Sequence, residues 1–469
     1  MKQSGLKANL FYNICYQILS LIVPLITSPY ISRVLGKIGV GEYSYTYSIA
    51  HYFVLFIMLG VLNYGNREIA RVKDDKIMLE KQFSGIYSVQ LVLGGIVSIV
   101  YIISVVFFEN TYRSIALIQM LYVASAIFDI SWFYFGIEKF KVTTCISTAN
   151  KLLTTILIFS LVKNQSDINI YTLILAGGVF CNNIAYWVFL RKYINNFKFN
   201  TIDLKKHLKP LIILFIPVIA VSIYKYMDKI MIGAMADISE VGIYEAAEKL
   251  VNLPLSLITA IGTVMLPRIS NLMKQSENSV VKQYNYVSME LIMILSFGIV
   301  FGLAGIAQVF VPLFYGLEFN ESTRVLIILL PSVLFVSWAN VVRTQCLLPN
   351  KRDKEYCISV IAGAIVNFSI NYALIPSLGA IGAACGTTIT EFLVCIIQCL
   401  QTRKQMEHKT YFVNCIPYAA SAIFMFLLIT RIRITSDVTT IIVRILVGGC
   451  VYLILSGILM ILKVKKKNY

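Results

Sequence analysis

Charged residues are scarce in this chain of 469 residues. Asp, Glu, Lys and Arg together make up 14% of it, whereas 58% is hydrophobic. Soluble globular proteins carry about 25% charged residues. With a mean hydropathy of +0.76, this deficit excludes an ordinary soluble domain and indicates a protein embedded in lipid.

Side chains that commonly catalyse reactions or bind metals are also few, or are not clustered in the sequence. There are three histidines, and none of the ten cysteines forms a CxxC pair or a Cys/His cluster. We therefore predict no metal, no disulfide and no cofactor. No Ser-His-Asp spacing is evident, and a membrane sugar polymerase would need a long polar external loop that this chain lacks. The prediction is a protein that is not an enzyme.

The net charge of +17 is the one feature that favours nucleic-acid binding. The Lys and Arg residues, however, lie in short loops between apolar runs and form no continuous basic face, so no nucleic-acid partner is predicted. A bias of this kind is typical of the positive-inside rule for membrane proteins.

Long apolar runs fill almost the whole sequence. A spanning helix needs roughly 20 mostly apolar residues, and the longest stretch outside such a run is about 191–209. The predicted class is an all-α polytopic membrane protein of about 14 spans, at 9–33, 43–66, 83–108, 113–136, 142–163, 170–192, 210–233, 240–266, 284–316, 322–346, 355–376, 380–402, 411–430 and 438–462.

The distribution of Lys and Arg orients these spans. Of the 41 such residues, 29 fall at the two termini and in the even-numbered loops, and 7 in the odd-numbered loops. Both termini are therefore predicted to be cytoplasmic.

An internal repeat is indicated by a shift of 201 residues. Val40, Gly41 and Tyr43 then fall on Val241, Gly242 and Tyr244. Parallel repeats are a transporter architecture, although helix–loop–helix units in lipid also resemble one another by composition. The prediction is an N-lobe at 1–195 with spans one to six and a C-lobe at 196–405 with spans seven to twelve. An appended pair of spans follows at 406–469.

An ionisable residue near the bilayer centre raises the free energy of membrane insertion by about 2.5–3.5 kcal/mol. Each such residue is therefore a candidate for a structural or functional role. Counting from span ends places Lys151 and Glu391 near mid-membrane, and Lys225, Asp228 and Lys229 in the outer half. Unbalanced cations facing an interior cavity suit an anionic cargo, such as a pyrophosphate or an acidic sugar.

Structural explanations compete with this hypothesis. Lys225 and Asp228 are spaced to pair at i,i+3. Glu245 and Lys249 are spaced to neutralise each other within one helix. Lys151 also has Asp129 or Glu391 as candidate partners in a contact that locks helices together.

Prolines and tyrosines mark two further features. Pro24 and Pro29 in the first span, and Pro217 in the seventh, predict breaks in those helices. Tyr43, Tyr45, Tyr47 and Tyr52 crowd the second span. They have the chemistry to contact sugars, although an interfacial belt or packing is the commoner explanation.

Three segments resemble the polysaccharide flippases of the MATE-like (MOP) exporter superfamily, often called Wzx-type. The first runs from Ser28 through the Arg33 and Tyr43 region to Tyr64-Gly-Asn-Arg-Glu-Ile-Ala-Arg71. The second includes Tyr226-Met-Asp-Lys-Ile-Met-Ile-Gly233 and Glu240-Val-Gly-Ile-Tyr244. The third includes Asn367-Phe-Ser-Ile-Asn371 and Gly382-Ala-Ala384, followed by Glu391. The third pattern is shared with lipid-linked peptidoglycan precursor flippases, and the first two are closer to the polysaccharide branch.

The resemblance implies two six-helix lobes around a central cavity and alternating access in a bacterial plasma membrane. It also implies a cargo of undecaprenyl-diphosphate-linked oligosaccharide for capsule or O-antigen synthesis. Arg33, Asp228 and Lys229 match motif positions. Lys151 and Lys225 are added from depth and charge. We predict Arg33, Lys151, Lys225 and Lys229 as cargo-binding cations.

Asp228 and Glu391 are the candidates for coupling to H⁺ or Na⁺. The alternative functions are a drug exporter of the same superfamily and a lipid-linked peptidoglycan precursor flippase. A drug or small-cation exporter would favour a net-acidic cavity, whereas the candidate residues here lean cationic.

Overall fold

The computed structural model describes residues 3–109, 111–195, 197–199, 202–275 and 277–467, and within these ranges the chain is helical without strands. In these described ranges, twelve helices are long and apolar enough to cross a membrane, and a bent pair within residues 206–235 makes a thirteenth. The first of the twelve, Leu19–Val72, contains a sharp kink and covers two of the predicted spans. The predicted all-α polytopic class is therefore confirmed.

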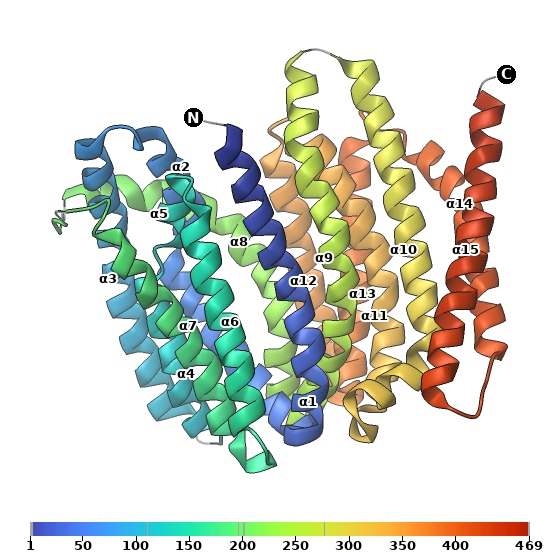
Figure 1. Cartoon of the computed structure of the whole chain (residues 1–469), viewed down its shortest axis with the longest axis horizontal. Coiled ribbons are helices and arrows are strands. Elements are labelled where there is room, and N and C mark those ends of the chain that lie inside the picture. Colours follow the sequence, from blue (N-terminus) through green and yellow to red (C-terminus); the bar gives the residue numbers. More distant parts are fainter. Residues whose placement is uncertain (1–2, 110, 196, 200–201, 276, 468–469) are drawn as a thin grey trace. The chain divides into compact units, whose positions relative to one another are not determined.

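The chain divides into two compact units, unit 1 (Met1–Ile230) and unit 2 (Met231–Tyr469), and the boundary lies inside α8. Figure 1 shows the helices along the chain. Unit 1 contains α1 (Gln3–Met58), α2 (Val61–Val72), α3 (Lys76–Phe108), α4 (Arg113–Ser125), η1 (Ala126–Phe128), α5 (Ser131–Gly136), α6 (Phe140–Leu161), η2 (Gln165–Asp167), α7 (Ile168–Leu190) and most of α8 (Ile202–Met235). The predicted lobe boundaries at 195 and 405 stay a prediction.

Two glycines divide the first long helical stretch. Gly36 has φ 66° and ψ −178°, which separates α1 into two limbs. Gly60, at φ 77°, separates α1 from α2. Positive φ is readily adopted only by glycine, so both breaks follow from residue type. At Pro24 and Pro29 the backbone of α1 keeps helical dihedrals, so the chain is not broken there, and a proline kink of the helix axis stays a prediction. The predicted break in the seventh span is found, since α8 bends by 44° between Lys206–Ile216 and Val218–Met235, at the position of Pro217.

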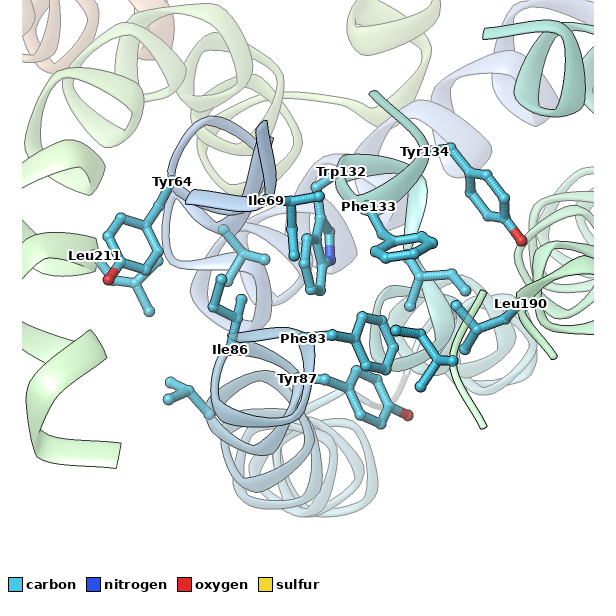
Figure 2. Packing of buried hydrophobic residues seen from close by; sticks show 14 of the residues in the cluster. Tyr64, Ile69, Phe83, Ile86, Tyr87, Trp132, Phe133, Tyr134, Leu190 and Leu211 are labelled. Carbon is cyan, nitrogen blue, oxygen red and sulfur yellow. The ribbon is translucent and has the colours of Figure 1, made fainter. Parts of the chain in front are cut away.

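One core of unit 1 is built on aromatic side chains from α2, α3 and α5, and Figure 2 shows it from close by. The Trp132 ring is fully buried and stacks on Phe83 at a centroid distance of 5.5 Å. Gly65 on α2 packs directly against the Trp132 ring, since a Cβ at Gly65 would lie 2.5 Å from Trp132 Cε3. A glycine is therefore needed for α2 and α5 to approach this closely.

The fourth predicted span is interrupted between α4 and α5. Its freed backbone carbonyls are satisfied by the buried Gln90 amide of α3, which donates to Ala126 O at 2.6 Å and to Asp129 O at 2.9 Å. The same side chain accepts a hydrogen bond from Trp132 Nε1 at 3.1 Å. Non-helical backbone at membrane depth persists only with such partners, because lipid supplies none.

Unit 2 contains α9 (Ile238–Lys274), α10 (Asn278–Tyr315), η3 (Leu317–Phe319), α11 (Ser322–Val342), the π-helical turn η4 (Arg343–Leu347), α12 (Asp353–Leu378), α13 (Ala380–Thr402), α14 (His408–Arg431) and α15 (Asp437–Lys467). The last two helices pack against α10. Gly298 and Gly305 on α10 leave room for Tyr452 and Ile429. The phenol of Tyr418 donates to Glu290 at 2.6 Å, and Arg444 donates to Gly305 O at 2.8 Å. The appended pair is thus an integral part of unit 2.

Helix bounds in the two halves follow the 201-residue shift at one place. The second limb of α1 begins after Gly36, at residue 37, and α9 begins at Ile238. The copies then differ, because the first is broken at Gly60 whereas α9 continues through Ala260 and Ile261, the equivalent positions. The absence of a glycine at this point in the second copy explains its unbroken helix.

Candidate functional site

The candidate site lies in unit 1 and begins with a column of rings on α1. Tyr43, Tyr47 and His51 are four residues apart, so they share one helix face. The rings of Tyr43 and Tyr47 stack at 5.7 Å, and the rings of Tyr47 and His51 lie 5.9 Å apart. All three side chains are half-buried. The column therefore keeps an accessible side.

Two neighbouring helices fix this column. Tyr122 of α4 forms a hydrogen bond of 2.8 Å with His51 Nδ1 and one of 3.2 Å with the Tyr47 hydroxyl. Its ring also stacks on Tyr47 at 4.9 Å. Tyr171 of α7 meets Tyr43 edge to face at 4.9 Å. Rings held by both stacking and hydrogen bonds have little freedom to turn away.

Helix α8 adds a ring and two cations. Tyr226 lies against His51 with a centroid distance of 4.1 Å. The ammonium of Lys229 is 5.3 Å from the Tyr226 ring centroid, and that of Lys225 is 5.9 Å from it. Both ammonium groups also act electrostatically on His51. We call Tyr43, Tyr47, His51, Tyr122, Tyr171, Lys225, Tyr226 and Lys229 the aromatic–cationic cluster.

Burial separates the charged members of α8. Asp228 and Lys229 are 1% and 6% exposed, whereas Lys225 is exposed. The Asp228 carboxylate acts electrostatically on Tyr52, whose hydroxyl donates to Ser222 O at 3.1 Å. This bond ties the second limb of α1 to α8. Charges buried at membrane depth are costly and are usually retained for function.

The other predicted site residues lie outside this cluster. Arg33 is an exposed residue of α1, three positions before the Gly36 kink. Lys151 of α6 is half-buried, and its ammonium donates to Ser20 Oγ at 2.8 Å. Glu391 is half-buried on α13 of unit 2. Of the six predicted residues, Lys225 and Lys229 therefore belong to the cluster, and Asp228 lies next to Lys229 on the same turn of α8.

Two of the proposed structural pairings are settled. Glu245 and Lys249 form an ion pair of 3.2 Å within α9, as their spacing predicts. The Asp129 carboxylate accepts a hydrogen bond from the Ser131 amide at 2.9 Å and caps α5. Asp129 is therefore not the partner of Lys151 in the described part of the chain.

Three aromatic members of the cluster, Tyr122, Tyr171 and Tyr226, were not predicted as site residues. Tyr122 and Tyr171 come from helices far along the chain. No local pattern distinguishes them from the other tyrosines among the 28 in the sequence. Tyr226 lies in the second resemblance segment between Lys225 and Asp228, which is a usable signal. Among the residues that the structure describes, no group of three His, Cys, Asp or Glu side chains is arranged to hold a metal ion.

Comparison with known proteins agrees with this architecture. Residues 6–273 match the model of a family described as polysaccharide biosynthesis protein. A protein of Escherichia coli named as an O-antigen transporter is 24% identical over 397 residues, covering 83% of this chain and 95% of that protein. A protein of Haloferax volcanii named as a low-salt glycan biosynthesis flippase is 25% identical over 167 residues, covering 36% of this chain and 35% of that protein.

Solved structures share the fold. The lipid II flippase MurJ in an inward closed conformation superposes with a TM-score of 0.79 at 17% identity, covering 96% of this chain and 98% of that one. An inward-facing multidrug resistance MATE family transporter of the MOP superfamily gives a TM-score of 0.61 at 13% identity, covering 82% and 98%. At these identities the likeness establishes the fold.

Proposed function

The chain belongs to the polysaccharide biosynthesis protein family, and from this we propose that it is a flippase for lipid-linked glycans. The cargo is an undecaprenyl-diphosphate-linked oligosaccharide repeat unit of a capsule or O-antigen. The protein moves it across the bacterial plasma membrane by alternating access, and both termini are cytoplasmic. No covalent step is needed, because the only barrier is the passage of a polar head group through hydrocarbon.

The observation that carries this proposal is the aromatic–cationic cluster. Its two lysines supply positive charge for a pyrophosphate. Its tyrosine rings supply flat apolar faces with hydroxyl edges for sugar rings. A bilayer-embedded scaffold gains nothing from this combination, since each buried charge costs free energy.

The remaining predicted residues take supporting roles in this proposal. Arg33 and Lys151 extend the cationic path in unit 1. Asp228 and Glu391 exchange H⁺ or Na⁺ to drive the cycle. Cargo uptake by inverted vesicles after collapse of both ion gradients tests the coupling, because undiminished uptake would remove any role for these carboxylates.

The experiment is genetic and biochemical. Deleting the gene should cause lipid-linked repeat units to accumulate on the inner leaflet. Complementation with Lys229→Ala or Arg33→Ala should leave that accumulation in place at normal protein levels in the membrane. The matched control is Lys139→Ala, which removes an exposed loop lysine outside every span and should restore export.

Two outcomes would contradict the proposal. Full export by both variants would show that these cations do not bind cargo. Accumulation of lipid-linked peptidoglycan precursors instead of glycan repeat units would identify a different cargo for the same fold.

A further inference from the structure

A recess separate from the aromatic–cationic cluster opens in unit 1 between the second limb of α1, α3 and α4. It has a volume of about 220 Å³ and is lined by residues that include Tyr45, Tyr101, Ser104, Phe108 and Glu109. It lies where α3 ends and α4 begins. By the predicted orientation this is the external side of the membrane.

A single carboxylate is fixed in this recess. Glu109 Oε1 accepts hydrogen bonds from the backbone amides of Thr111 at 3.1 Å and Tyr112 at 2.9 Å. These bonds hold the side chain in place and leave Oε2 available as a second acceptor. Tyr45 also lines this recess, so its hydroxyl is a second candidate acceptor. Two acceptors therefore face the same small volume.

Aromatic rings surround that carboxylate. Tyr45 and Tyr112 meet edge to face at 5.8 Å, and Tyr101 is buried with its hydroxyl donating to Ala116 O at 2.7 Å. Phe108, on the rim, is 83% exposed, as expected for an aromatic residue at the lipid interface. Ring faces next to a carboxylate attract an organic cation.

A cation is anchored at the end of α3, which carries several lining residues of the recess. Arg113 Nε donates to Glu109 O at 3.0 Å, and its Nη2 donates to Val106 O at 2.9 Å. The guanidinium is thus held next to the residue that carries the carboxylate. A carboxylate and a guanidinium at residues 109 and 113 are complementary in charge to a zwitterion that carries one ammonium and one phosphate.

We propose that this recess binds a phosphoethanolamine group, supplied by the head group of an ethanolamine phospholipid. The primary ammonium donates hydrogen bonds to Glu109 Oε2 and the Tyr45 hydroxyl, and the phosphate lies toward Arg113. The exposed Phe107 and Phe108, 72% and 83% accessible, contact the acyl region. The site is independent of the glycan cargo.

The test is lipid binding to the whole purified protein, measured by native mass spectrometry with phosphatidylethanolamine, phosphatidylcholine and phosphatidylglycerol. Phosphatidylethanolamine should bind most tightly, because the choline head has no N–H donor and the glycerol head has no cation. Glu109→Gln keeps an acceptor for both backbone amides but removes the charge. This variant should weaken the binding of phosphatidylethanolamine about tenfold, since hydrogen bonds to charged groups are about twice as strong as neutral ones.

The matched control is Asp167→Asn. Asp167 also caps backbone amides, those of Lys163 at 2.8 Å and Asn164 at 2.9 Å, at the same end of unit 1. The Asp167→Asn variant should leave the preference for phosphatidylethanolamine unchanged. Tyr45→Phe should reduce the preference for phosphatidylethanolamine over phosphatidylcholine without abolishing it.

Three outcomes would overturn the proposal in whole or in part. Equal binding of the three lipids by the unaltered protein would show that the recess is not a phosphoethanolamine site. An unchanged preference in Glu109→Gln would show that the carboxylate does not hold the ammonium. Displacement of the lipid by equimolar glycerophosphoethanolamine would overturn the lipid as the source and assign the site to a soluble phosphoethanolamine compound.

Discussion

Replacing Gly65 by alanine tests the close packing of α2 on α5. The added Cβ would lie 2.5 Å from Trp132 Cε3 and 2.7 Å from Cδ2, about 1 Å inside normal contact. The Trp132 ring has no room to yield, because it is fully buried and stacked on Phe83. Any shift also strains its hydrogen bond of 3.1 Å to Gln90.

The expected cost has two parts. Overpacking a close-packed core costs about 1–3 kcal/mol, and a weakened buried hydrogen bond adds about 0.5–1.5 kcal/mol. Alanine recovers about 1 kcal/mol of helix propensity relative to glycine. Gly95→Ala is the matched control, since it lies in a helix and its Cβ would have no neighbour within 4 Å. Gly65→Ala should therefore be about 2–4 kcal/mol less stable than Gly95→Ala.

The assay is equilibrium unfolding in mixed detergent micelles, followed by tryptophan fluorescence. The chain has three tryptophans, and Trp132 and Trp187 both contact Phe83 in this core. Equal free energies of unfolding for the two alanine variants would refute the packing of α2 against the Trp132 ring.

Three further changes probe single contacts by the same unfolding assay. Gln90→Leu should lower the free energy of unfolding by about 2–4 kcal/mol, because it removes the side-chain donor to the carbonyls of Ala126 and Asp129 and the acceptor of the Trp132 indole N–H; a neutral effect would mean that the break needs no side-chain support. Tyr418→Phe should cost about 1–3 kcal/mol by removing the 2.6 Å bond to Glu290, and equal stability would show that the bond does not hold α14 on α10. Lys351→Gly should stabilise by about 0.5–1 kcal/mol, since residue 351 has φ 57°, whereas a loss of stability would indicate a role for the exposed lysine side chain.

Much of the fold was predictable because lipid leaves the chain few options. An apolar run of about 20 residues must satisfy its backbone internally, and a helix does so without help from the rest of the sequence. The spans therefore followed from hydropathy alone. The ion pair of Glu245 and Lys249 was predictable for the same reason, since both partners lie on one helix face.

Breaks in the helices were predictable only in part. The bend at residue 217 coincides with a proline, whereas α1 stays helical at Pro24 and Pro29 and breaks at Gly36 instead. The interruption after Ser125 has no local signal of this kind. It exists because Gln90, on another helix, supplies hydrogen bonds to the freed carbonyls.

The sequence by itself determined that this protein is helical and membrane-embedded, and that Lys225, Asp228 and Lys229 form one charged turn of α8. Hydropathy and helical spacing are properties of contiguous residues, so they can be read along the chain. Only the tertiary structure decided that Tyr122 and Tyr226 enclose His51, and that Lys151 meets Ser20. Those contacts join residues 71, 175 and 131 positions apart, and such pairings arise from helix packing, which no local pattern encodes.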